Sequence, residues 1–117
     1  MLTRRLMVAL VASSVGLAVA PRMALAQASH LEQAIAETKE AIHEGKRDEP
    51  ASLVEHAVNA LDHANAAQKE KPSEHIKTGV THLKKAIKTA KHTHSSRRVA
   101  RAVKHAETAL THFEAAK

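Results

Sequence analysis

The chain has 117 residues, enough for one domain, and it contains ten histidines, no cysteine and one aromatic residue, Phe113. Without cysteine it forms neither a disulfide nor a thiolate metal site. The formal charge of +6 at pH 7 fits a nucleic-acid-binding protein, but the lack of aromatic side chains that could stack on bases argues against that class.

Residues 1–26 are predicted to be a secretory signal peptide. Arg4 and Arg5 precede a largely apolar stretch, residues 6–20, and the small-residue run 24–26 is typical of a cleavage site. We expect cleavage after Ala26, with Ala28 as the second choice. The apolar stretch is shorter than the ~20 residues that span a bilayer, so we expect no stable membrane insertion after cleavage. The arginine pair also resembles a twin-arginine motif, although the general secretory route is favoured.

Cleavage would change the composition of the protein. Three of the 18 basic residues, Arg4, Arg5 and Arg22, would leave, so 15 basic residues would face 12 acidic ones and the charge would fall to +3. All three methionines lie before residue 27, whereas all ten histidines lie after it. A metal site in residues 27–117 would therefore use imidazole, carboxylate, backbone oxygen or water.

The first half of residues 27–117 is predicted to form two helices. The first covers about residues 29–44, because Ser29 and Glu32 form a capping box and Gly45 is a typical helix end. The second covers about residues 50–69, with Asp48 as a plausible cap and Pro50 suited to the first turn.

The second half repeats this arrangement. Pro72 breaks the chain, Ser73 caps a third helix to about residue 91, and a fourth helix covers about residues 97–116. No segment has the pattern of a strand. Because the connectors are short, neighbouring helices should be antiparallel. We predict an all-α, up-down antiparallel four-helix bundle in residues 27–117, built as a duplicated helical hairpin.

A seven-residue repeat gives the four helices one register. Heptad position a holds the larger aliphatic residues Ile35, Ile42, Val54, Leu61, Val80, Ile87, Val103 and Leu110. Position d holds Leu31, Ala57, Ala64, Ile76, Leu83, Ala90, Ala106 and Phe113. Position g holds the small residues Ala34, Ala41, Ala60, Gly79, Ala86, Ala102 and Ala109. We expect a buried a/d stripe, and a core this rich in alanine predicts modest stability.

Most of the histidines share a single heptad position, c, at the edge of the expected stripe. They are His30, His56, His63, His75, His82, His105 and His112, and Glu37 occupies the same position. Histidines seven residues apart on one helix lie about 10.5 Å apart, too far to share an ion whose bonds to nitrogen are about 2 Å. The ligands of one ion must therefore come from two helices.

Folding each hairpin about its turn pairs specific c residues. The first hairpin pairs His30 with His63 and Glu37 with His56. The second pairs His75 with His112 and His82 with His105. The alternative is that the hairpins pack through their e faces, which would instead pair Lys77 with Glu114 and Lys84 with Glu107.

Three histidines lie outside this pattern and are weaker candidates as metal ligands. His43 lies beside Glu40 and Glu44, and the Glu-x-x-His spacing of di-iron bundles occurs only this once. His92 and His94 lie in the predicted connector between the third and fourth helices.

This ligand set predicts the class of metal. Imidazole with a few carboxylates suits Cu(II), Ni(II), Zn(II) and Co(II), and Cu(II) binds most tightly of these. Cu(I) is disfavoured because thiolate and thioether are absent. Since only neutral imidazole binds a metal, affinity should fall below about pH 6.

The heptad motifs run through residues 27–117 as HLEQAI at 30–35, LVEHA at 53–57, LDHA at 61–64, HLKKAIK at 82–88, VKHA at 103–106 and His112. In these motifs the chain resembles the small metal-binding protein family. The resemblance implies a periplasmic four-helix bundle that binds several divalent ions, copper foremost, for storage or handling. Glu37, Glu44, Thr78 and Thr89 stand where that family tends to have histidine, which implies a lower capacity here and makes a site at Thr89 doubtful.

Other functions fit the sequence less well. No nucleophile–base constellation supports an enzyme, and no Cys-x-x-Cys-His motif supports covalent haem. Haem would also sit in the core, away from the c histidines. A helical interaction or chaperone-like bundle is the alternative to metal binding. We expect a monomer whose partners are metal ions rather than nucleic acid.

Overall fold

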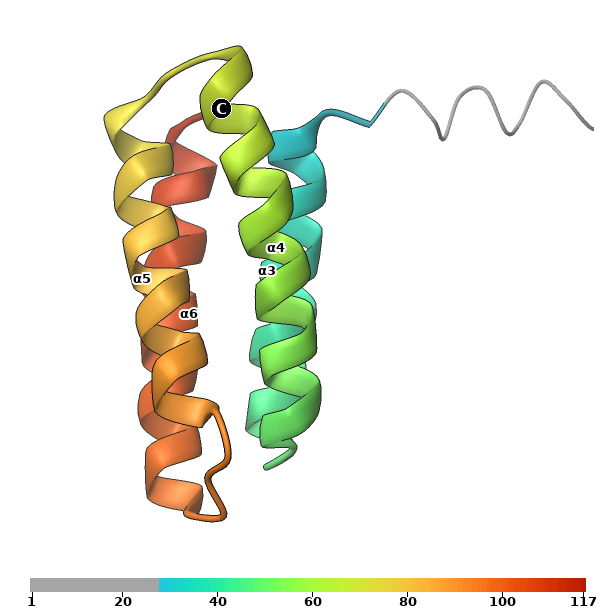
Figure 1. The fold of residues 1–117 in the computed structure, drawn as a ribbon, viewed down its shortest axis with the longest axis vertical. Coiled ribbons are helices and arrows are strands. Elements are labelled where there is room, and N and C mark those ends of the chain that lie inside the picture. Colours follow the sequence, from blue (N-terminus) through green and yellow to red (C-terminus); the bar gives the residue numbers. More distant parts are fainter. Residues whose placement is uncertain (1–27) are drawn as a thin grey trace, which may run out of the picture.

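A computed structural model describes residues 28–117, and this part of the chain forms four helices without strands (Figure 1). They are α3 (His30–Lys46), α4 (Pro50–Glu70), α5 (Glu74–Ala90) and α6 (Ser96–Ala115). The predicted all-α class is confirmed. The signal peptide, its cleavage and the export route were predicted for residues 1–26, which lie outside the described residues.

The helices form the predicted four-helix bundle. α3 packs against α4 and α6, and α5 packs against the same two helices. Consecutive helices run in opposite directions, so the α3–α4 turn and the α5–α6 connector lie at the lower end of Figure 1. Within residues 28–117 no helix combines the length and the apolar character needed to cross a membrane.

Serine residues cap the amino-terminal ends of three helices. The side chain of each accepts a hydrogen bond from a backbone N–H that has no partner inside its helix. Ser29 accepts from the N–H of Glu32, and Ser73 accepts from the N–H of Ile76. Ser95 caps α6 in the same way. The caps predicted at Ser29 and Ser73 are therefore confirmed.

Asp48 does not cap α4, contrary to the sequence prediction. The residue before α4 is Glu49, whose side chain makes no capping bond. Asp48 has a φ of 60°, and its carboxylate accepts a hydrogen bond of 2.7 Å from the Ser96 hydroxyl. This residue instead joins the α3–α4 turn to the start of α6.

Gly45 was expected to end the first helix; α3 ends one residue later, at Lys46, and Gly45 is buried in its last turn. A Cβ at this position would overlap the side chains of Leu53 and Val103. Gly79 in α5 is in a similar position, since a Cβ there would overlap the ring of Phe113. Both glycines are explained by close approach between helices.

The buried seam runs along positions d and g, whereas the sequence predicted a and d. All the small g residues are buried, including Ala34, Ala60 and Ala109, each with no exposed surface. Five of the larger a residues are only partly buried: Val54, Leu61, Val80, Ile87 and Leu110. The helices approach through their alanines, so these five a side chains lie at the flank, whereas Ile35, Ile42 and Val103 are buried. Position c is four residues before g, so it borders this seam directly.

Candidate metal-binding sites

Each hairpin has a groove in which the c side chains of its two helices meet. The first groove lies between α3 and α4 and contains His30, Glu37, His56, His63 and Glu70. The second groove lies between α5 and α6 and contains His75, His82, His105 and His112. All four predicted cross-hairpin pairs therefore lie side by side.

The alternative packing through e faces is wrong. The e-position residues Lys39 and Glu114 form an ion pair of 3.6 Å between α3 and α6. The e side chains therefore meet between the two hairpins, and the c side chains meet within each one.

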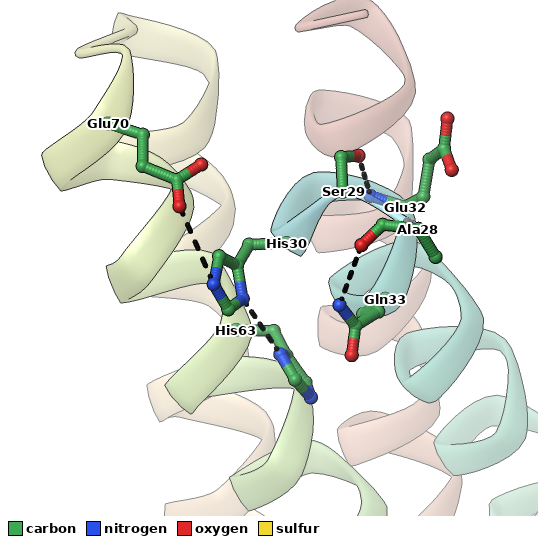
Figure 2. A network of polar contacts seen from close by, with 7 residues as sticks. All are labelled: Ala28, Ser29, His30, Glu32, Gln33, His63 and Glu70. Carbon is green, nitrogen blue, oxygen red and sulfur yellow. Dashed lines mark hydrogen bonds and ion pairs between the residues drawn. The ribbon is translucent and has the colours of Figure 1, made fainter. Parts of the chain in front are cut away.

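At the open end of the first groove, the His30 ring lies between His63 and Glu70 (Figure 2). The two Nδ1 atoms of the histidines are 3.2 Å apart, and His30 Nε2 is 3.5 Å from Glu70 Oε1. A proton on Nε2 that faces the carboxylate leaves Nδ1 of His30 as an acceptor for the Nδ1–H of His63. A carboxylate behind a histidine in this way orients the ring for a metal. Glu70 was missed in the sequence, although it follows His63 by seven residues and so shares position c.

Further along the first groove, Glu37 and His56 form a hydrogen-bonded ion pair. His56 Nδ1 lies 2.7 Å from Glu37 Oε2, and each side chain is about two-thirds buried. The hydrogen bond to Glu37 raises the pKa of His56 above its ordinary value, against the opposing effect of burial. A metal ion must displace this proton to bind His56 through Nδ1.

The donor side chains that meet in the second groove are all imidazoles. His75 and His112 place their Nδ1 atoms 3.2 Å apart. The ring of His82 lies 6.0 Å from that of His105 and 6.1 Å from that of His112. Its Nδ1 atom is buried, and no group in residues 28–117 forms a hydrogen bond with it. Burial, followed by the charges of Lys85 and the two neighbouring histidines, lowers the pKa of His82.

The donor atoms are spaced for pairwise binding. Two nitrogens bound to one ion at about 2.0–2.1 Å lie roughly 2.9–3.4 Å apart for bond angles between right and tetrahedral. The observed 3.2 Å in both Nδ1 pairs falls in this range. Among residues 28–117, no three His, Asp or Glu side chains are grouped closely enough to hold one ion. An ion held by either pair would therefore take its remaining ligands from water.

The three weaker candidates lie outside both grooves. His43, His92 and His94 are exposed, and no hydrogen bond or ion pair within the described part of the chain joins them. His92 has a φ of 57° in the α5–α6 connector. The structure therefore does not bring them together as one site.

Comparison with known proteins supports the chemistry of these grooves. A search of curated proteins finds no match. The family model described as small metal-binding protein matches residues 4–116, which is nearly the whole chain. That description names metal binding and no reaction. The donor pairs in both hairpins agree with it, and the chain belongs to the small metal-binding protein family.

Proposed function

We propose that this protein binds divalent transition-metal ions outside the cytoplasm and holds them for storage, buffering or trafficking. The ions are held between the two helices of each hairpin, with Cu(II) bound most tightly and Ni(II), Zn(II) and Co(II) less so. The observation that carries the proposal is the Nδ1···Nδ1 distance of 3.2 Å in both hairpins, between histidines 33 and 37 residues apart in the chain.

The chemistry of the donors supports this preference. Imidazole nitrogen suits Cu(II), Ni(II) and Zn(II), and copper leads this series for a given set of ligands. Two protein ligands with water give weaker and more exchangeable binding than the four ligands of a structural zinc site. Exchangeable binding suits a protein that takes up and releases ions.

The chaperone-like alternative needs an apolar surface for its clients. Among the described residues, Val58 is the only large hydrophobic residue that is exposed, at 40%. This surface gives little support to that alternative.

Calorimetric titration with Cu(II), Ni(II) and Zn(II) tests the proposal. The protein to use lacks residues 1–26, since all four helices and their caps lie within residues 28–117. His63→Asn and His105→Asn each break one groove and should lower affinity or capacity. His43→Asn is the matched control, because His43 is exposed outside the grooves. Binding no tighter than that of free histidine for every metal would contradict the proposal.

A further inference from the structure

The two hairpins carry opposite charge, and metal binding does not explain the positive charge of the second one. Counting from the sequence with neutral histidines, residues 28–72 contain nine acidic and five basic residues, a net charge of −4. Residues 73–117 contain three acidic and ten basic residues, a net charge of +7. The total of +3 conceals this division. A surface that attracts anions is therefore present although the whole bundle is only weakly basic.

The positive charge is concentrated in residues 84–104, which contain eight basic residues and no acidic one. We call these eight residues the basic end: Lys84, Lys85, Lys88, Lys91, Arg97, Arg98, Arg101 and Lys104. All eight are exposed, and none takes part in an ion pair of the described structure. Their charges are thus available to a partner.

The fold brings these residues to one end of the bundle. They lie on the last turns of α5 and the first turns of α6, on either side of their connector (Figure 1, orange, lower end). The amino-terminal end of α6 adds its own partial positive charge at the same place.

A shallow hollow of about 360 Å³ lies beside the basic end. Its rim includes Lys91, His92 and His94, and its apolar lining includes Pro50 and Val54. Cations beside an apolar hollow match an anion that carries hydrocarbon.

We propose that the basic end docks the protein onto an anionic phospholipid surface. The basic side chains contact the phosphate headgroups, and the hollow receives the apolar part of a lipid beside them. Each Lys or Arg near such a surface strengthens binding by about fivefold. The eight side chains together make a surface-bound state stable at low salt.

A nucleic acid is the other polyanion to consider. Single strands are held by stacking on aromatic side chains, but Phe113, the one Phe, Tyr or Trp of the chain, is fully buried. An apolar hollow also has no role in binding a phosphodiester backbone. These two observations favour lipid.

Vesicle binding by the metal-free protein lacking residues 1–26 tests the proposal independently of metal binding. We expect binding to phosphatidylcholine vesicles that contain about 30% phosphatidylglycerol, loss of binding at high salt, and none to phosphatidylcholine alone. The variant K85Q/K88Q/R101Q should bind about 100-fold more weakly. The matched control K69Q/K71Q/K77Q removes the same charge from exposed residues toward the other end and should bind nearly as the unmodified protein does.

Ala51 provides a test of the hollow, because it is exposed and lines it. Ala51→Gln introduces a polar side chain without changing charge and should weaken vesicle binding a few-fold; unchanged binding would remove the hollow from the proposal. Equal weakening in the two triple variants, or no binding to the anionic vesicles, would overturn the basic end as a docking site. Tighter binding to a short DNA duplex than to vesicles at the same salt would assign the surface to nucleic acid instead.

Discussion

The α3–α4 and α5–α6 hairpins share one heptad register but differ in the chemistry of their grooves. Glu37 in the first hairpin occupies the position that His82 occupies in the second, and each faces the corresponding histidine of the partner helix. The pKa of His56 is raised beside Glu37, whereas the pKa of His82 is lowered by burial among imidazoles and lysine. The heptad repeat sets the positions of the donor side chains. The residues packed around each histidine then set the direction of its pKa shift.

This difference acts on metal loading in two opposite ways. In mildly acidic solution His82 of the second groove loses its proton more readily, because its pKa is lowered, whereas His56 of the first groove holds its proton, because its pKa is raised. At longer range, the first hairpin attracts cations through its net charge of −4, whereas the second hairpin repels them through its net charge of +7. Salt screens that longer-range attraction beyond about 8–10 Å. We therefore expect low salt to favour the first groove and mild acid to favour the second.

The cores of the hairpins differ as well. Ala34 and Ala64 of the first hairpin correspond in the repeat to Gly79 and Phe113 of the second. Where the first hairpin has two alanines, the second has one phenylalanine and one glycine. The Phe113 ring occupies the space that a Cβ of Gly79 would need. The two hairpins thus fill equivalent space by different means.

The largest expected effect is the loss of this aromatic ring. Phe113→Ala should lower the free energy of unfolding by about 3–5 kcal/mol, because it empties a fully buried site in an otherwise small core. The counterpart change in the first hairpin, Ala64→Gly, should cost only about 1 kcal/mol. Urea unfolding followed by circular dichroism measures both. Equal costs would show that the ring adds nothing beyond what an alanine supplies.

Gly79→Ala should have a smaller effect on the same measurement. Overpacking against Phe113 costs about 1–3 kcal/mol, and the better helix propensity of alanine offsets roughly 1 kcal/mol of it. In a protein that already carries Phe113→Ala, the same change should be neutral or stabilising because the clash is gone. A double-mutant cycle gives this coupling. Additive changes in the free energy of unfolding would contradict a close contact between Gly79 and Phe113.

Exchanging the two c residues should exchange the metal-binding behaviour of the grooves. Glu37→His replaces the carboxylate that holds the proton on His56 with an imidazole and should raise the Cu(II) affinity of the first groove near pH 6, because the ion no longer competes with that proton. His82→Glu places a carboxylate opposite His105 and should lower the Cu(II) affinity of the second groove at the same pH. Titrations at pH 6 and pH 7.5 measure the effect. Unchanged pH dependence in both variants would show that these partners do not control loading.

The smallest expected effect is the pH dependence of stability without metal. Because the pKa of folded His56 is raised, its pair with Glu37 stabilises the fold fully below the unfolded pKa of about 6.5, and this contribution is lost as pH rises through the folded pKa. Glu37→Gln should remove this pH-dependent contribution to the free energy of unfolding, which is less than about 1 kcal/mol. The contribution of His82 to stability has the opposite pH dependence. Because the pKa of folded His82 is lowered, the free energy of unfolding decreases as pH falls below the unfolded pKa of about 6.5.

Proton NMR titration of the histidine rings measures both pKa values directly. His82→Asn serves as the second variant and should reduce the loss of stability in acid. A His56 pKa that stays the same in Glu37→Gln would exclude the carboxylate as the cause of the shift.

Local patterns in the sequence determined much of this molecule. Serine before a helical pattern predicts a cap because the first N–H groups of a helix lack partners, and the caps at Ser29 and Ser73 follow this rule. The seven-residue period predicts which side chains share a helix face. Together with short turns, it also predicts which c side chains meet across each hairpin, as His30 and His63 do.

Only the tertiary structure decided how closely the helices approach and which faces they use. Gly45 lies one residue before the end of α3, as its local pattern predicts, but only the packing shows that it is buried where Leu53 and Val103 leave no room for a Cβ. The buried seam shifted from a/d to d/g because alanine allows close backbone approach, which heptad letters alone do not express. The opposite pKa shifts of His56 and His82 likewise depend on what lies opposite each ring. Period and capping are properties of one helix, whereas burial and protonation are set by the neighbours that packing brings together.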